Sequence, residues 1–95
     1  MASITEVADD IYRVNVEITG SPVTYSFFVI KDDLPTMVET GFGRLFNETV
    51  EAVKKIIDPS TLRYIVVPHF EGDESGALNH FLGLAPNAQP VCSPV

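Results

Sequence analysis

Apolar and polar residues alternate along the first part of the chain, between short segments rich in turn-forming residues. A period of two is typical of strands that place one face on a core. The alternation predicts strands over residues 4–7, 11–18, 24–31 and 36–40, with an acidic turn at Asp9-Asp10 between the first two. The third strand is so continuously apolar that we expect neither of its faces to be exposed to solvent. The chain is therefore expected to open as a meander of hairpins.

The period changes to that of a helix after residue 44. Residues 44–57 form an amphipathic pattern, with charged residues on the side opposite the apolar positions. On the charged side, Glu51 and Lys55 are spaced for a weak i,i+4 ion pair. We interpret this helix as a structural one that packs on the core and has a solvated outer face. Its in-phase apolar positions are Phe46, Val50, Val53 and Ile57.

An apolar segment after the helix predicts a strand over residues 62–67. Because strand, helix, strand connections close right-handed with the two strands parallel, we expect this strand to lie beside strand 36–40. Between that earlier strand and the helix lies Gly41-Phe42-Gly43. Glycines at such a junction can cradle a phosphate, but the third glycine of the nucleotide-binding fingerprint is absent. A plain tight turn is the favoured interpretation.

The last part of the chain predicts one more helix and one more strand. Ser75 is a suitable N-cap for a helix over residues 76–82, and Gly83 and Pro86 are expected to end it. A short strand is predicted over residues 89–93. The order of elements predicts a mixed α/β fold, in which two helices pack on a mixed sheet.

The in-phase apolar positions of these elements predict a single core. At 95 residues the chain is long enough for one modest core. The residues expected to be buried together are Phe27, Val29, Val50, Val53, Ile65, Val67, Leu78 and Phe81.

Composition limits the organisation and the partners. Residues 1–95 are expected to form one domain, and a formal net charge of −7 disfavours nucleic acid and anionic membranes as partners. No apolar segment approaches the roughly 20 residues of a membrane span. The single cysteine, Cys92, cannot form an internal disulfide and is interpreted as a buried strand residue. We therefore expect a reducing, cytoplasmic location.

Candidate chemistry gathers directly after the strand that follows the long helix. His69, Glu71 and Asp73 alternate there, so their side chains share one face in extended backbone, and Glu74 follows them. An imidazole and carboxylates that converge at the end of a buried strand are typical of a metal site. A solvated acidic turn is the structural alternative. His80 is interpreted as a surface or capping residue rather than a ligand.

These residues resemble the motif of a known family. His69-x-Glu71-x-Asp73 followed by Glu74-Ser75-Gly76 is similar to the metal-binding motif of the metallo-β-lactamase superfamily, which in its hydrolases usually reads His-x-His-x-Asp-His. With Glu at the second ligand position, it resembles the di-iron branch, the flavodiiron oxygen and nitric oxide reductases and their oxygen-binding relatives. Residues 38–41, Val-Glu-Thr-Gly, are similar to the strand-end Asp-Thr-Gly of the family, and residues 84–88 precede a short strand in a similar way.

The resemblance implies the N-terminal half of a metallo-β-lactamase-like αββα sandwich. It also implies a non-haem di-iron site that binds or reduces dioxygen or nitric oxide, with zinc as the alternative metal. The implied metal ligands are His69, Glu71, Asp73 and Glu74. Two positions depart from the family, since Glu74 stands where it usually has a second His and Glu39 where it usually has Asp. Glu74 is expected to ligate through oxygen, to pair with a nearby cation, or to leave the second metal position empty.

Other functions remain open on this sequence. The chain could be a non-catalytic interaction or structural module that has lost its metals, or a metal-dependent hydrolase, which the absent second His disfavours. In the proteins it resembles, further ligands and the strands that cover the sheet come from a second half. We therefore expect this chain to self-associate through an exposed strand edge, or to be a fragment of a longer protein, and to bind iron only weakly by itself.

Overall fold

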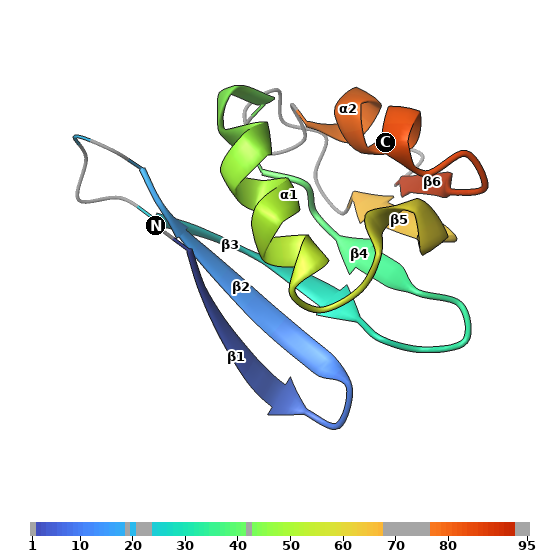
Figure 1. The fold of residues 1–95 in the computed structure, drawn as a ribbon, viewed down its shortest axis with the longest axis horizontal. Coiled ribbons are helices and arrows are strands. Elements are labelled where there is room, and N and C mark those ends of the chain that lie inside the picture. The colour runs from blue at the N-terminus through green and yellow to red at the C-terminus, as the bar shows by residue number, and fades with distance from the viewer. Residues whose placement is uncertain (1, 19, 21–23, 42, 68–76, 93–95) are drawn as a thin grey trace.

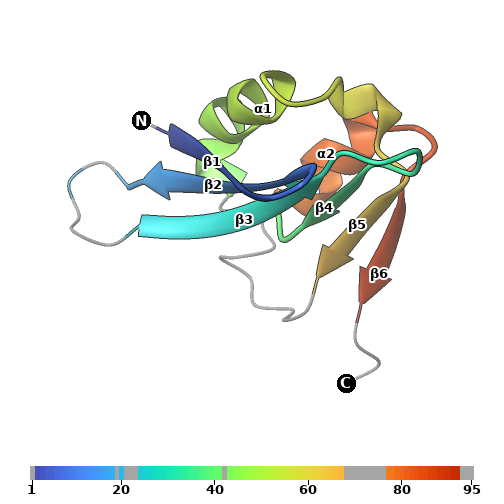
Figure 2. The same cartoon turned by 90° about the horizontal axis from the view of Figure 1, so that it is seen from below.

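The structure, a computed structural model, describes residues 2–18, 20, 24–41, 43–67 and 77–92. These residues form a six-stranded mixed sheet with two helices on one of its faces (Figure 1, Figure 2). The strands lie in the sheet in sequence order, β1-β2-β3-β4-β5-β6. The predicted mixed α/β fold is confirmed. Within the described residues, no helix is long and apolar enough to cross a membrane.

The first four strands form the predicted antiparallel meander. They are β1 (Ala2–Ala8), β2 (Ile11–Glu17), β3 (Thr24–Ile30) and β4 (Thr36–Val38). The predicted acidic turn joins β1 to β2, and there Asp10 adopts a left-handed conformation with φ of 61°. The Asp10 amide donates a hydrogen bond to a Glu6 carboxylate oxygen at 3.0 Å. The strands lie within two residues of where the two-residue period predicts them. The largest shortfall is in β4, predicted over residues 36–40, which ends at Val38 because the next residue, Glu39, has a positive φ of 68°.

Two parallel strands complete the sheet. β5 (Tyr64–Val67) pairs with β4, and β6 (Gln89–Cys92) pairs with β5. The predicted parallel pairing across the helix is thus confirmed. β5 begins two residues later than predicted, because Leu62 follows a 3-10 turn, η2 (Pro59–Thr61), and is buried outside the strand. Since β4 and β5 are parallel, their carboxyl ends meet at the same edge of the sheet.

Helix α1 (Phe46–Lys54) follows a 3-10 turn, η1 (Gly43–Leu45), and is shorter than predicted. After the helix the chain tightens into a turn that keeps its last apolar residues packed against the core. The predicted pairing of Glu51 with Lys55 is therefore wrong. Glu51 pairs instead with Lys54, three residues away, at 3.6 Å.

Helix α2 (Leu78–Leu84) begins and ends two residues later than predicted. Ala77 takes the N-cap position without a side-chain capping hydrogen bond, and the predicted cap, Ser75, lies outside the described residues. Gly83 lies inside the helix instead of ending it. At this exposed position a glycine costs the helix only about 1 kcal/mol, whereas the extra residues bring Ala85 into the core at 1% exposure.

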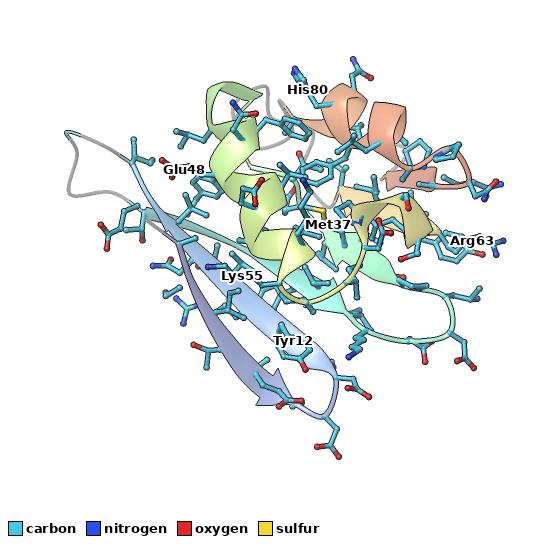
Figure 3. The ribbon with its side chains drawn as sticks, viewed as in Figure 1. Tyr12, Met37, Glu48, Lys55, Arg63 and His80 are labelled. Carbon is cyan, nitrogen blue, oxygen red and sulfur yellow. The ribbon has the colours of Figure 1, made fainter. Side chains whose placement is uncertain are left out.

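The core lies between the sheet and the two helices. Of the predicted core residues, Leu78 is partly buried against the core, and the rest are buried. The buried ones are Phe27, Val29, Val50, Val53, Ile65, Val67 and Phe81. Met37, at the centre of the sheet below α1, is also fully buried (Figure 3).

The opposite face of the sheet carries no helix in the described part of the chain (Figure 2). β3 shows the consequence, because Phe27 is fully buried whereas Phe28 is 37% exposed. The prediction that neither face of this strand is exposed is therefore wrong. A continuously apolar strand indicates two covered faces, but the described elements cover only one of them.

Candidate functional site

The carboxyl ends of β4 and β5 define the edge at which the sequence predicts a site. β5 ends at Val67, which is 1% exposed, and the next described residue is the fully buried Ala77. Between these two, and outside the described residues, lie the predicted metal ligands His69, Glu71, Asp73 and Glu74. The structure thus places Val67 and Ala77, the two residues that flank residues 68–76, which we call the motif segment. The arrangement of its ligand side chains stays a prediction.

β4 continues into the segment Glu39-Thr40-Gly41, which lies beside the end of β5. The Glu39 amide donates to the Val66 carbonyl oxygen at 2.8 Å, so the parallel pairing extends one residue beyond β4. Glu39 and Gly41 both have positive φ angles, 68° and 80°. A glutamate in this conformation is uncommon and persists only where surrounding contacts hold the backbone. The segment is therefore a sharp turn with a defined shape.

The Tyr25 side chain of β3 packs directly over Gly41. A Cβ atom added at Gly41 would lie 2.7 Å from the Tyr25 Cζ and Oη atoms, which is closer than real side chains approach. The Tyr25 hydroxyl lies 2.8 Å from Thr49 Oγ1 on α1, and Thr49 Oγ1 donates to the Leu45 carbonyl oxygen at 2.9 Å. Because a threonine hydroxyl has one hydrogen, Tyr25 is the donor to Thr49. This explains why residue 41 must be glycine and supports the tight-turn interpretation.

Gly41 also contacts the other side of the edge. Its carbonyl oxygen accepts a hydrogen bond from the Ala77 amide at 3.2 Å. Ala77 is the residue at which the chain returns from the motif segment to begin α2. One glycine therefore connects the end of β4 with the start of α2. Through Gly41, the position of Ala77 depends on Tyr25 and α1.

A small pocket of about 180 Å³ opens beside this turn. Its lining combines two hydroxyl side chains, a tyrosine, a carboxylate and the turn backbone. The residues are Thr24, Tyr25, Ser26, Glu39 and Gly41. The pocket is polar and acidic, so it suits water or a small hydrogen-bonding group better than an apolar ligand.

His80 lies on the exposed side of α2 (Figure 3). Its ring packs against Phe46 at a centroid distance of 4.9 Å, and Phe46 in turn meets the buried Phe81 edge-on at 5.0 Å. The interpretation of His80 as a surface residue is confirmed. Its side chain contributes to the contact between α1 and α2.

Shifted pKa values occur away from this edge. Partial desolvation, followed by the negative charges of Glu6 and Asp10, raises the pKa of Tyr12 beside the first turn. Hydrogen bonds from the Ser60 amide and hydroxyl hold the pKa of Asp58 below its ordinary value. Asp58 precedes β5, so neither group belongs to the candidate site.

No group of three or more His, Cys, Asp or Glu side chains that could hold a metal ion occurs among the described residues. Sequence reasoning missed the contribution of Tyr25 and Thr49 to the edge. The available signal was the pair of polar residues at otherwise apolar, core-facing positions of a strand and a helix.

The sequence of this chain is similar to those of several known proteins. No family model matches the chain. A flavo-diiron protein of Clostridium acetobutylicum is 34% identical over 70 residues, which are 74% of this chain and 18% of that protein. A nitric oxide reductase of Moorella thermoacetica is 36% identical over 75 residues, 79% of this chain and 19% of that protein. The chain thus spans about a fifth of the length of these curated relatives.

Solved structures give the same fold. A flavoprotein from Thermotoga maritima superposes with a TM-score of 0.85 at 22% identity, over 99% of this chain and 28% of that one. Rubredoxin oxygen:oxidoreductase from Desulfovibrio gigas superposes with a TM-score of 0.80 at 23% identity, over 93% of this chain and 25% of that one. By fold and by sequence, the chain therefore resembles the flavodiiron branch of the metallo-β-lactamase-fold superfamily and corresponds to a fragment of its metallo-β-lactamase-like domain.

Proposed function

We propose that this chain is part of a non-haem di-iron domain that binds dioxygen or nitric oxide. The main support is the position of Val67 and Ala77, the residues that flank the motif segment, at the carboxyl edge of the parallel strands. Ligand sites in open α/β sheets form at this edge. The names of the related proteins, a flavo-diiron protein and a nitric oxide reductase, agree with this proposal.

The donor chemistry of the motif segment fits iron. One imidazole and three carboxylates lie within six residues, and anionic oxygen donors suit a redox-active iron pair. The proposed ligands are His69, Glu71 and Asp73, with Glu74 as an oxygen ligand, a partner for a nearby cation, or a residue that leaves the second position empty. The names of the relatives refer to di-iron and flavin and give zinc no support.

The described residues would serve this site by fixing the positions of the strand and the helix on either side of the motif segment. Parallel pairing fixes the end of β5, and the hydrogen bond between Gly41 and Ala77 fixes the start of α2. Bound iron would supply the electrons and the open coordination positions that dioxygen or nitric oxide requires. The buried residues at the edge would limit the access of water to that side of the site.

We further propose that residues outside this chain complete the site. Four ligands from one short segment cannot supply a full coordination shell for two metal ions, so the chain alone should bind iron weakly. Oxygen or nitric oxide reduction would also need an electron donor. A reducing, cytoplasmic location is proposed with this function, since ferrous iron and a single cysteine are both compatible with it.

The test is a ferrous iron titration under anaerobic conditions, after purification without chelator and elemental analysis. Replacing His69, Glu71 and Asp73 together by Ala should abolish binding, whereas Asp33→Ala, which removes an exposed carboxylate in a distant turn, should leave it unchanged. Zinc instead of iron would favour a metal-dependent hydrolase. Absence of any specific metal binding would favour a non-catalytic module.

A further inference from the structure

The turn at the end of β4 contacts the chain on both sides of the motif segment. On the side before it, the Glu39 amide donates to the Val66 carbonyl oxygen at 2.8 Å. On the side after it, the Gly41 carbonyl oxygen accepts a hydrogen bond from the Ala77 amide at 3.2 Å. Two residues of one turn therefore set the spacing between the end of β5 and the start of α2.

The backbone of this turn needs support from other elements. Glu39 and Gly41 both have positive φ angles, which a glutamate rarely adopts and which a glycine leaves easily for other conformations. Such a backbone persists only where surrounding contacts determine it. Thr40, between the two, is fully buried and ties the middle of the turn to the core. Gly41 has no side chain that could do the same, so its position depends on what packs over it.

Tyr25 on β3 packs over Gly41 and is itself held in place. A Cβ atom at Gly41 would lie 2.7 Å from the Tyr25 Oη atom, so the ring leaves the turn no room to move towards it. The same hydroxyl lies 2.8 Å from Thr49 Oγ1, on a fully buried residue of α1. The Tyr25 ring is therefore fixed at one end by the β3 backbone and at the other end by α1. A hydrogen bond that is partly shielded from water makes such an arrangement rigid.

The packing of the two helices does not depend on this hydrogen bond. Phe46 of α1 meets Phe81 of α2 edge-on, with 5.0 Å between the ring centroids. The Phe81 amide also donates to the Ala77 carbonyl oxygen at 3.0 Å, in the first turn of α2. Both contacts remain when the Tyr25 hydroxyl is removed. The loss of that hydroxyl should therefore loosen the turn and the Ala77 amide while the fold persists.

We propose that Tyr25 is a positioning residue for the iron site, which acts through Gly41 on the spacing between β5 and α2. This role rests on the proposed function, because the implied ligands lie between these two elements in the sequence. Metal–ligand distances are fixed to within about 0.2 Å, so ligands whose flanking backbone can drift bind the metal more weakly. Residues that orient ligands without touching the metal typically change its affinity by about 10–100-fold. The Tyr25 hydroxyl is engaged by Thr49 and acts by holding the turn.

The test uses two variants that remove the hydrogen bond from opposite sides. Tyr25→Phe keeps the ring over Gly41 but removes its hydroxyl, and Thr49→Val removes the partner hydroxyl at nearly the same volume. Thr49→Ser keeps that hydroxyl and should behave like the unsubstituted protein. NMR measures the hydrogen exchange of the Glu39 and Ala77 amides without metal, and an anaerobic titration measures the affinity for ferrous iron.

We expect Tyr25→Phe and Thr49→Val to accelerate the exchange of these two amides and to lower the ferrous affinity, each by about tenfold. Leu62→Val is the matched control, because Leu62 is fully buried at the opposite end of β5. It should destabilise the core but leave the ferrous affinity unchanged in protein that circular dichroism shows to be folded. Either hydroxyl variant is sufficient if the other does not fold.

Unchanged ferrous affinity in the hydroxyl variants, with binding by the unsubstituted protein intact, would overturn the positioning role and leave the proposed function standing. A loss of affinity without faster exchange would also overturn it, because the turn would then not be the link. An equal loss in Leu62→Val would show that affinity follows stability alone, which contradicts the positioning role. If the unsubstituted protein binds no iron, the proposed function fails and the positioning role fails with it.

Discussion

Phe27 and Phe28 are neighbours in β3, yet Phe27 is fully buried and Phe28 is 37% exposed. Their side chains point to opposite faces of the sheet, of which α1 and α2 cover only the first. In β4 the same difference separates the buried Met37 from the half-buried Val38. Residue type therefore makes both faces apolar, whereas the position of the helices decides which face becomes the core.

The largest expected effect comes from truncating the two phenylalanines separately. Phe27→Ala should lower the free energy of unfolding by about 3–5 kcal/mol, because it leaves a cavity in the core, and Phe81→Ala should cost about as much. Phe28→Ala should cost about 1 kcal/mol or less in the monomer, since its side chain is partly solvated already. Denaturant titration at low protein concentration measures all three. Equal losses for Phe27 and Phe28 would show that both faces are enclosed.

A smaller effect is expected where the core-facing Tyr25 contacts Gly41. Gly41→Ala should be destabilising for two reasons, the positive φ and the collision with the tyrosine ring. Gly20→Ala is the matched control, since Gly20 has φ of 81° but no neighbouring atom within 4 Å.

The control should cost about 1 kcal/mol for its backbone conformation. Gly41→Ala should cost about 1–3 kcal/mol more, because Tyr25 must move. The measurement is thermal or denaturant unfolding of both variants. Equal losses of stability in the two variants would mean that the Tyr25 side chain can move aside at no cost and does not hold the turn.

A substitution that strengthens helix α2 should raise the free energy of unfolding, whereas the substitutions described above should lower it. Gly83 lies inside α2 with ordinary helical φ and open space around it. Gly83→Ala should therefore raise the free energy of unfolding by about 0.5–1 kcal/mol, through helix propensity and reduced freedom of the unfolded chain. A decrease in stability would show that the chain leaves the helix at this residue, as the sequence pattern predicts.

The smallest effect should be a dependence of stability on acid pH at the turn that leads into β5. The pKa of Asp58 is held below its ordinary value of 3.8 by hydrogen bonds from Ser60, so its stabilising contribution is present above that pH and is lost as the pH falls through the folded-state value. Asp58→Asn keeps an acceptor for the Ser60 amide but removes the titration. The difference in the free energy of unfolding between the unsubstituted protein and Asp58→Asn should shrink as the pH falls from 5 to 2. A difference that does not depend on pH would show that the ionised Asp58 does not stabilise this turn.

The local periods of the sequence predict the elements well. Alternation locates the four strands of the meander, and the change to a helical period locates α1, because each element has a face that must be buried. The parallel pairing of β4 with β5 follows from the handedness of the connection. Helix ends are predicted less well. Gly83 continues α2, because the burial of Ala85 outweighs the low helix propensity of glycine.

The sequence by itself determined the chemistry of the candidate site and its place after a buried strand. It also determined the family resemblance, since the donor residues and their spacing are local properties. Only the tertiary structure decided what holds the edge of that site. The residues that hold it come from separate parts of the sequence, and their contacts exist only once α1 packs on the sheet. They are Tyr25, Gly41, Thr49 and Ala77. The two faces of β3 were decided in the same way, because covering a face requires a partner that no single segment contains.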